Sequence, residues 1–283
     1  MDLGLGLPIR HPAVLPEWAR RAEAAGFDSL ALLDRLAYDN PEPLVALSVL
    51  AGATSRVRLQ TEVLLAPLRP TALLAKQVAT LNAMCAGRFV LGVGVGGRPD
   101  DHAAAGIPLE RRGAILDRQL TDLRRIWRGE PYQGAVIGPV PAAAPPILIG
   151  GFAPAALRRV ARHADGFLCA APLAWAGRLV DQVNDDWAAA GRAGRPRLVG
   201  QINVAAGGPA TIEQARRAIA AYYAFTGHGA GGDGWGAPLS DPHEIAAAVA
   251  AYRDFGADEL VLYCYADDPG QVEELAAVAR LAE

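Results

Sequence analysis

Short apolar runs alternate with helix-forming segments along the whole chain, and this alternation restricts the fold more than any other feature. Eight runs have strand character, at residues 3–7, 28–33, 57–65, 88–93, 146–149, 166–170, 198–205 and 259–263. Most are continuously apolar, which is typical of parallel strands covered by helices. Eight such units predict one α/β domain over residues 1–283, a (β/α)8 TIM barrel with insertions. A doubly wound sheet is the alternative, but it usually has fewer strands.

Helix-forming segments follow these strands, at residues 16–25, 43–54, 71–85, 111–127, 154–163, 174–190, 211–225 and 271–281. The segment at 111–127 is the clearest, because Leu116, Leu120 and Leu123 form an apolar stripe at helical spacing. Three stretches interrupt the alternation, at residues 94–110, 129–145 and 227–238. The last contains six glycines and is a candidate lid over the strand ends, although a disordered insertion explains it equally well.

The composition and charge of the chain argue against nucleic-acid-binding, membrane-spanning and secreted proteins. Hydrophobic residues make up 52% of the chain, and the net charge of -3 gives no basic surface for nucleic acid. The N-terminus does not resemble a signal peptide, and no apolar run approaches the ~20 residues of a membrane helix. The 3 cysteines and 5 histidines are scattered singly, which favours reduced thiols and no metal site. We therefore expect a cytoplasmic protein with no nucleic-acid or membrane partner.

A glycine pair lies between a predicted strand and a predicted helix. Gly150 and Gly151 follow the strand, and Pro154 opens the helix, where its missing N–H leaves no hydrogen bond unmade. Glycines allow a ligand to approach the backbone, and a helix N-terminus favours phosphate, but a tight turn without a ligand explains the pair equally well. A second glycine-rich stretch, at 92–97, lacks a dinucleotide fingerprint and indicates close backbone packing or a flat ligand.

Three charged residues stand in or just after predicted strands. Asp34 and Arg35 follow the second strand, at the end of a barrel that carries the site, so they either bind a polar ligand or form a surface ion pair. Glu62 lies inside an apolar run, where a carboxylate is costly unless it is paired or functional. It is either a site group with a raised pKa or an outward-facing residue paired with Arg58 or Arg69.

The remaining polar features are few. Arg111 and Arg112 open an amphipathic helix, where positive charge is unfavourable, so they either bind an anion or are simply solvated. The chain has no nucleophile elbow, no phosphate-binding Gly-Lys-Ser/Thr loop and no paired-carboxylate pattern. Such a barrel is typical of an enzyme that relies on an organic cofactor. The residues alone predict a barrel that binds a flat, phosphorylated ligand.

Several segments resemble the bacterial luciferase-like oxidoreductases. The matching segments, in the order of the family, are residues 18–34, 50–59 (Leu-Ala-Gly-Ala-Thr-Ser-Arg-Val-Arg-Leu), 75–81, 87–94 (Gly-Arg-Phe-Val-Leu-Gly-Val-Gly), 126–127 and 164–167 (Ala-Asp-Gly-Phe). The resemblance extends from residue 3 to about residue 282. It implies a luciferase-like TIM barrel that binds FMN or the 5-deazaflavin coenzyme F420, usually as a homodimer.

The resemblance also implies which residues form the site. The family has a cis peptide bond in the third strand, in a bulge against the flavin ring, and the matching bond here is Glu62–Val63. The glycine pair is similar to the family's phosphate loop, and residues 95–101 match the loop beside the ring. The implied cofactor contacts are Asp34, Glu62, Val63, Val95, Gly96, Gly97, Asp100, Arg112, Gly150, Gly151 and Phe152. The candidate catalytic residues are Asp34, Arg35 and Glu62.

Four positions depart from patterns of the family. Glu62 stands where a small residue, Thr or Ser is more common, so it contacts the ring, acts as an acid or base, or obstructs the site. Arg35 and Gly97 replace the His and Glu of the F420-dependent sugar-phosphate dehydrogenases, which argues against that activity. Val95 replaces an Arg of the alkanal monooxygenases, which argues against light emission.

Three hypotheses for the function follow from this resemblance. The leading one is a monooxygenase that uses molecular oxygen and reduced FMN, supplied by a separate flavin reductase, to oxidise a small organic substrate. The first alternative is an F420-dependent enzyme that transfers hydride without incorporating oxygen. The second is a flavin-binding or scaffold barrel without turnover, in which Glu62 blocks the ring site.

Overall fold

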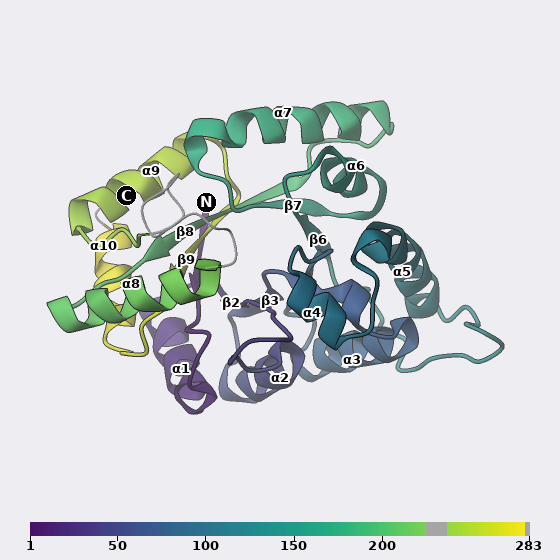
Figure 1. Cartoon of the computed structure of the whole chain (residues 1–283), viewed down its shortest axis with the longest axis horizontal. Coiled ribbons are helices and arrows are strands. Elements are labelled where there is room, and N and C mark those ends of the chain that lie inside the picture. Colours follow the sequence, from purple (N-terminus) through teal and green to yellow (C-terminus); the bar gives the residue numbers. More distant parts are fainter. Residues whose placement is uncertain (225–236, 281–283) are drawn as a thin grey trace.

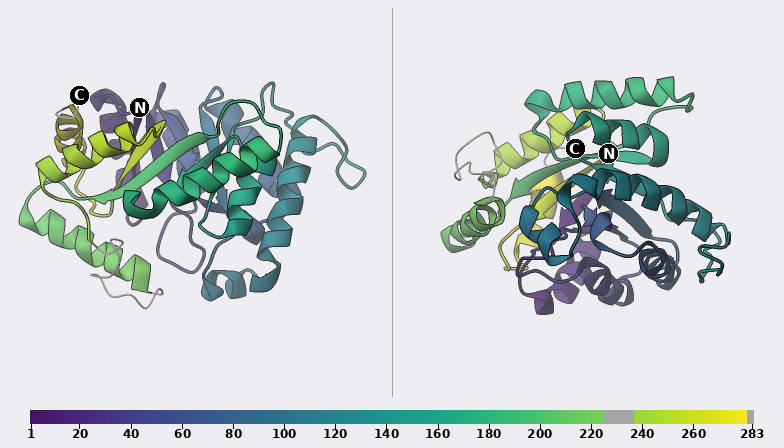
Figure 2. Two further views of the ribbon diagram at one scale, coloured as in Figure 1. Left: turned by 90° about the horizontal axis from the view of Figure 1, so that it is seen from above. Right: turned by 45° about the vertical axis from the view of Figure 1, so that its right-hand side comes forward.

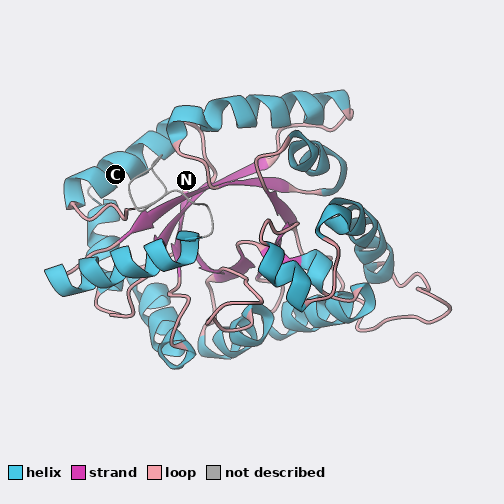
Figure 3. Ribbon diagram, viewed as in Figure 1, coloured by secondary structure: helices cyan, strands magenta, loops and turns pink. Residues whose placement is uncertain are grey.

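The computed structural model describes residues 1–224 and 237–280. Its centre is a closed barrel of parallel strands inside a ring of helices, a TIM barrel (Figures 1 and 3). The strands are β1 (Asp2–Gly6), β2 (Ser29–Leu32), β3 (Arg58–Thr61), β4 (Leu64–Leu65), β5 (Phe89–Gly94), β6 (Ile147–Gly150), β7 (Gly166–Cys169), β8 (Arg197–Val204) and β9 (Glu259–Cys264). A pairing between β3 and β5 closes the barrel, which excludes the doubly wound sheet.

The third barrel strand is divided into two halves, β3 and β4. Both halves pair with β5, the first through Leu59 and Gln60 and the second through Leu64 and Leu65. The bond Glu62–Val63, between the halves, is cis. The single strand expected at 57–65 is therefore interrupted, and the predicted cis bond is confirmed.

Helices cover the outside of the barrel. They are α1 (Leu15–Ala25), α2 (Pro43–Ala53), α3 (Thr71–Met84), α4 (Pro99–Ala104), α5 (Arg112–Trp127), α6 (Pro154–His163), α7 (Leu173–Ala189), α8 (Pro209–Tyr223), α9 (Pro242–Asp254) and α10 (Gln271–Arg280), with the 3-10 helices η1 (Pro12–Val14), η2 (Ala66–Leu68) and η3 (Leu109–Arg111). The helices α1, α2 and α3 lie on one side of the barrel, and α6 and α7 lie on the opposite side (Figures 1 and 2).

Two helices, α4 and α9, are present where the sequence predicts none. The helix α9 has clear signals that the prediction overlooks. Asp241 accepts hydrogen bonds from the first N–H groups of the helix, and Ile245, Val249 and Tyr252 form its buried face. The helix α4 is only one and a half turns long and lies in the stretch expected to be irregular, so periodicity alone would not reveal it.

Three aspartates connect neighbouring strands by hydrogen bonds at the N-terminal end of the barrel. Each one precedes a strand and accepts a hydrogen bond from a backbone N–H at the start of the adjacent strand. The pairs are Asp28 with Leu3 N at 2.8 Å, Asp165 with Ile147 N at 2.8 Å, and Asp258 with Leu198 N at 2.7 Å. These bonds fix the strands relative to one another where each strand begins.

Two of the three stretches that interrupt the alternation of strands and helices lie within the described residues. Residues 128–146, between α5 and β6, extend away from the body of the barrel (Figure 2). The loop after β5 contains α4 and borders the cavity described below. The candidate lid at 227–238 lies, except for its last two residues, outside the described residues. Within 1–224 and 237–280, no helix is both long and apolar enough to cross a lipid bilayer.

Candidate active site

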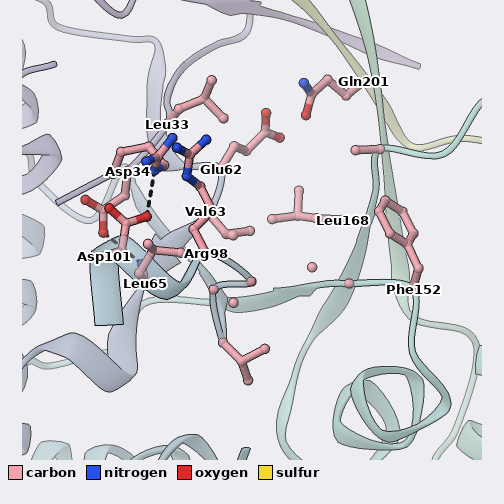
Figure 4. A pocket seen from close by; sticks show the side chains of 18 of the residues that line it. Leu33, Asp34, Glu62, Val63, Leu65, Arg98, Asp101, Phe152, Leu168 and Gln201 are labelled. Carbon is pink, nitrogen blue, oxygen red and sulfur yellow. Dashed lines mark hydrogen bonds and ion pairs between the residues drawn. The ribbon is translucent and has the colours of Figure 1, made fainter. Parts of the chain in front are cut away.

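A cavity of about 500 Å³ opens at the carboxyl ends of the barrel strands (Figure 4). Its apolar wall includes Leu33, Val63, Leu65, Val95, Leu168 and Val199, and its charged lining is Asp34, Arg35, Glu62, Arg98, Asp101 and Arg112. TIM-barrel enzymes carry their active sites at this end, and the volume suits a cofactor-sized ligand. All the residues expected to contact a cofactor line this cavity except Asp100.

The break in the third strand places Val63 against two glycines. A side-chain carbon at Gly94 would lie 2.6 Å from Val63 Cγ2, and one at Gly150 would lie 2.8 Å from Val63 Cγ1. Any larger residue at either glycine would collide with Val63. The ends of β5 and β6 therefore leave the space that the bulge occupies, and Val63 forms part of the cavity wall.

Both carboxylate oxygens of Asp34 have partners within the protein. Oδ2 accepts from Leu65 N at 2.8 Å and from Arg69 Nη1 at 2.7 Å, and Oδ1 accepts from Arg69 Nη2 at 3.2 Å. Burial raises the pKa of Asp34, while Arg69 and the Leu65 N–H oppose the rise. Asp34 lines the cavity, but its hydrogen bonds hold the second half of the third strand in place.

Arg35 pairs with Asp101 and not with its neighbour Asp34. Its side chain is only 4% exposed, and its Nε donates to Asp101 Oδ2 at 2.6 Å. Asp101 Oδ1 also accepts from the N–H groups of Leu36 and Ala37, which fixes the loop after β2. The alternative of a surface ion pair between Asp34 and Arg35 is wrong, because both are buried with other partners. Arg35 Nη1 is buried without a partner among the described residues.

Glu62 is buried beside the cavity and faces the barrel interior. Its Oε1 accepts from Gln60 Nε2 at 3.2 Å, whereas its Oε2 has no hydrogen-bond partner in the described part of the chain. Burial and then the charge of Glu259 raise the pKa of Glu62 well above its ordinary value, as predicted. The alternative of an outward-facing glutamate is wrong, because Glu62 is only 4% exposed and Arg58 and Arg69 pair with other carboxylates.

The Gly150–Gly151 turn joins β6 to α6 and forms another part of the cavity wall. Gly151 has a φ of 141°, and a side-chain carbon there would lie 2.8 Å from Ala156 Cβ, so the position requires glycine. Among the described residues no side chain caps α6, so the N–H groups of its first turn have no side-chain acceptor. Phe152 lies across the cavity from Asp101 in Figure 4 and contacts Trp175 edge to face, with ring centroids 5.3 Å apart.

The loop after β5 contributes Val95, Gly96 and Gly97 to the cavity wall, as expected. Asp100 lies outside the cavity, where its carboxylate is 46% exposed and pairs with Arg98 at 3.0 Å. The hydrogen bond from Arg98 lowers the pKa of Asp100 to about 2. Asp101, one residue later, lines the cavity in its place.

The two arginines at the start of α5, Arg111 just before it and Arg112 as its first residue, differ in position. Arg112 lines the cavity, and its Nε is buried without a partner among the described residues. Its Nη1 donates to the carbonyl oxygen of Leu109, which holds the side chain beside the wall. Arg111 is exposed to solvent and lies outside the cavity. Arg112 therefore remains the candidate for anion binding, and Arg111 is the solvated one.

Several residues of the cavity are not predicted from the sequence. They are Leu33, Leu65, Gly94, Leu168, Cys169, Ala170, Val199, Gln201, Tyr222 and Tyr223, whereas Arg98 and Asp101 belong to the loop at 95–101 that the resemblance implies. Gln201 is a polar residue inside a largely apolar strand, and this pattern could have identified it as a residue of the cavity. So is the sequence of Arg58, Gln60 and Glu62 at alternate positions, which points three polar side chains to one face of a strand.

The sequence matches the family described as Luciferase-like monooxygenase over residues 2–277. The chain belongs to this family. Its fold neighbours and relatives include monooxygenases, one of them solved with FMN, and F420-dependent dehydrogenases.

Curated relatives match the chain over part of their length. An uncharacterised protein of Mycobacterium tuberculosis is 34% identical over an alignment of 181 residues, and the match covers 53% of this chain and 62% of that protein. An F420-dependent glucose-6-phosphate dehydrogenase of Nakamurella multipartita is 33% identical over an alignment of 207 residues, and the match covers 64% of this chain and 60% of that protein. The matched regions thus span less than two thirds of these relatives.

Solved structures share the luciferase-like barrel at lower identity. Monooxygenase RslO1 from Streptomyces bottropensis has 22% identity and a TM-score of 0.78, over 99% of this chain and 97% of that one. An F420-dependent secondary alcohol dehydrogenase in complex with an F420-acetone adduct has 16% identity and a TM-score of 0.83, over 100% and 99%. The FMN complex of the oxygenating constituent of 3,6-diketocamphane monooxygenase from Pseudomonas putida has 19% identity and a TM-score of 0.75, over 98% and 96%. These likenesses confirm the predicted fold.

Proposed function

We propose that this protein is a monooxygenase that binds reduced FMN in the cavity and uses molecular oxygen to oxidise a small organic substrate. The observation that carries the proposal is the cavity itself, with the Val63 bulge and the Gly150–Gly151 turn before the uncapped α6 in its wall. Reduced FMN, when bound, supplies the two electrons that activate oxygen. A solved monooxygenase with FMN bound shares the fold, which supports the choice of cofactor.

The lining of the cavity fits the two chemically different parts of FMN. The apolar side chains of Val63, Leu65 and Leu168 suit a flat aromatic ring. The first turn of α6 and the Arg112 guanidinium suit a phosphate, because backbone N–H groups and positive charge both stabilise an anion. We therefore expect the ring against the bulge and the phosphate at the Gly151 turn.

The residues of the cavity would then bind, orient and protect the cofactor. Asp34 and Arg69 hold the wall behind the ring, and Arg35 offers the unpaired Nη1 as a donor. The apolar side chains would exclude water from the reacting atoms. Glu62 is hydrogen-bonded to Gln60, and a cavity of about 500 Å³ remains beside it. This free volume supports a cofactor-binding site and not the alternative in which the Glu62 side chain blocks the ring site.

An F420-dependent hydride-transferring enzyme is the second candidate. It is favoured by the glucose-6-phosphate dehydrogenase relative, whose name includes that coenzyme, at 33% identity over 207 residues. FMN and F420 share a flat tricyclic ring and a phosphate, so the same cavity would suit either. The two cofactors differ in their reaction with oxygen, and this difference separates the candidates.

The experiment is a titration of the purified protein with FMN and F420, each oxidised and reduced, under anaerobic conditions. We expect saturable binding of reduced FMN, followed on admission of oxygen by oxidation whose rate depends on the protein. Binding of F420 alone would replace the first candidate by the second. Failure of all four forms to bind would remove both.

We also propose that the enzyme receives reduced FMN from a separate reductase in the cytoplasm and is a homodimer. Buried free thiols at all three cysteines support a reducing compartment. The dimer is supported by α2, in which Ser48 is the only polar residue and in which Val45 and Val49 are 64% and 56% exposed. A helix that is apolar all round is normally covered on every side.

Replacing both valines of α2 by glutamate tests the dimer. The variant Val45→Glu/Val49→Glu should be a monomer by light scattering after size-exclusion chromatography, because two charges cannot be buried in an apolar interface. The matched control is Val136→Glu in the extending loop, where Val136 is 60% exposed, and it should leave the dimer intact. A wild-type protein that is monomeric at micromolar concentration would contradict the proposal.

A further inference from the structure

A row of polar residues runs along the inside of the barrel, on β3 and on the residue directly after it. Arg58 and Gln60 on β3 and Glu62 just past its end occupy alternate positions, so their side chains point to the same side of the chain. The interior of a TIM barrel is usually filled with branched apolar residues. Here Gln60 and Glu62 are 1% and 4% exposed, and the buried carboxylate of Glu259 on β9 joins them.

Two glycines of β1 make room for this row. A side-chain carbon at Gly4 would collide with the hydroxyl of Ser29 and lie 3.0 Å from Glu259 Oε1. At Gly6 it would collide with the ring of Tyr263. The alternation of glycine and leucine in β1 thus leaves interior space that polar side chains occupy, which indicates that the row is a built feature of the barrel.

The two buried glutamates have very different surroundings. Glu259 Oε2 accepts from Arg197 at 2.9 Å and from Arg58 at 3.4 Å, and its Oε1 accepts from the hydroxyl of Ser29. Glu62 accepts one hydrogen bond, from Gln60. Two arginines stabilise a negative charge on Glu259, whereas no cation pairs with Glu62 among the described residues.

Gln60 connects the two glutamates through a single nitrogen. Its Nε2 donates to Glu62 Oε1 at 3.2 Å and to Glu259 Oε1 at 3.3 Å, so both carboxyl groups lie within hydrogen-bond distance of one amide nitrogen. Two carboxylates this close cannot both ionise easily in a buried site. Because the arginines keep the charge on Glu259, the proton belongs on Glu62, and because Oε1 accepts from Gln60, it belongs on the unpartnered Oε2.

We propose that Glu62 is a protonated acid whose Oε2–H donates a hydrogen bond to a carbonyl oxygen in the cavity, and that Gln60 and Glu259 are the positioning residues that keep the proton there. The carbonyl belongs to the cofactor ring or to a ketone or aldehyde substrate. The identity of this acceptor rests on the proposed function, whereas the position of the proton does not. A donor at this point would polarise the carbonyl toward attack.

The other groups around Glu62 agree with a neutral acid. Burial and the charge of Glu259 raise the pKa of Glu62. Burial and then the charge of Glu62 raise the pKa of Tyr263, so the neighbouring phenol does not favour a negative charge on Glu62. Arg35, which also lines the cavity, already pairs with Asp101. Gln201, on β8, is uncharged.

Infrared difference spectroscopy of the full chain without cofactor tests the position of the proton. The spectrum of the wild type minus that of Glu62→Gln should contain the carbonyl band of a protonated carboxylic acid at neutral pH, and raising the pH should remove it. In Glu259→Gln the band should disappear at a pH lower by about one unit or more, because the repelling charge is gone. The matched control is Glu130→Gln, which changes an exposed glutamate paired with Arg125 and Arg128, and its difference spectrum should lack the band.

Absence of the band at neutral pH, or an unchanged midpoint in Glu259→Gln, would overturn the proposal. If circular dichroism shows that Glu259→Gln does not fold, the wild-type midpoint decides alone, and a value near the ordinary glutamate pKa of 4.5 would overturn the proposal.

Adding FMN, F420 or acetone to the wild type then locates the acceptor. A shift of the band with FMN or F420 alone assigns the acceptor to the ring, and a shift only after acetone is added assigns it to a substrate carbonyl. No shift, when the cofactor binds, would contradict donation into the cavity. Failure of the cofactor to bind while the band is present would remove the proposed function and leave the protonated Glu62 intact.

Discussion

Asp258 and Glu259 at the N-terminal end of the barrel contrast with Glu62 at its carboxyl-terminal end. At the N-terminal end Asp258 accepts from Leu198 N and from both terminal nitrogens of Arg195, and Glu259 is bound by two arginines. Although burial raises the pKa of Asp258, the hydrogen bonds from Arg195 and Leu198 N lower it below its ordinary value. At the carboxyl-terminal end Glu62 has one oxygen without a partner in the described chain, and its pKa is raised.

This difference separates stability from ligand binding within one fold. Polar groups whose hydrogen bonds are all made inside the protein hold the strands together, and they have no free donor or acceptor for a ligand. A buried donor or acceptor left without a partner is destabilising, so it persists where a ligand or a reaction makes use of it. The contrast predicts opposite responses to the same substitution at the two ends.

The largest expected effect is on stability, from replacing each buried glutamate by glutamine. Glu259→Gln should lower the free energy of unfolding at neutral pH by about 3 kcal/mol, because Arg58 and Arg197 lose a buried carboxylate. Glu62→Gln should leave it unchanged or raise it, because Glu62 has no cation partner among the described residues. Urea unfolding of both variants measures the difference, and equal losses would remove the distinction between the two ends.

The next largest effect is expected on cofactor binding, from adding one methyl group. Gly151→Ala should weaken binding of reduced FMN at least about tenfold, because the new carbon would displace the turn at Ala156. Gly194→Ala is the matched control, since Gly194 also has a positive φ, of 66°, but lies before β8 with nothing within 4 Å of the added carbon. Equal loss of affinity in both variants would show that the Gly151 turn has no special part in binding.

The smallest expected effect is a pair of opposite pH dependences. Glu23 accepts from N–H groups before β3; burial raises its pKa, but the bonds from Arg56, Val57 and Ser55 lower it to about 2. Its contribution to stability is therefore present above the ordinary value of 4.5 and lost as the pH falls toward 2. Because Glu23 is partly exposed, we expect Glu23→Gln to be less stable than the wild type by only about 1 kcal/mol at neutral pH.

For Glu62 the sign is reversed. Its pKa is raised on folding, so its contribution is present below 4.5 and lost as the pH rises toward the raised value. The wild type should therefore lose stability relative to Glu62→Gln with increasing pH, while its advantage over Glu23→Gln disappears at acid pH. Chemical unfolding at several pH values measures both trends, and slopes of the same sign would contradict the assignment of the two carboxylates.

The barrel could be predicted from the sequence because its signals are local. Apolar runs and helix-forming segments each depend on neighbouring residues, and the structure confirms the predicted helices to within two residues at their described ends. The helix α9 has the same kind of local signal, an N-terminal Asp241 and a buried apolar face, although the prediction does not include it. The cis bond at Glu62–Val63 came from the family resemblance, because no local pattern of residues distinguishes it.

The partners of the charged residues could not be predicted, because the closure of the barrel selects them. Arg69, 35 residues along the chain, holds Asp34, and Asp101, 66 residues along, holds Arg35. In the sequence the nearest opposite charge to Asp34 is Arg35, yet the two are not paired in the fold. A functional, buried Glu62 is one of the two alternatives that the sequence allows, but the link through Gln60 to Glu259 depends on a contact between β3 and β9 across the barrel interior.

A crystal structure of the protein grown anaerobically with reduced FMN would test the central claim most directly. We predict the flavin ring in the cavity against Val63 and the phosphate at the Gly150–Gly151 turn, with Glu62 beside the ring. Density for FMN elsewhere on the molecule, or an empty cavity at a saturating concentration of FMN, would contradict the claim that the carboxyl-terminal end of this barrel is a flavin site.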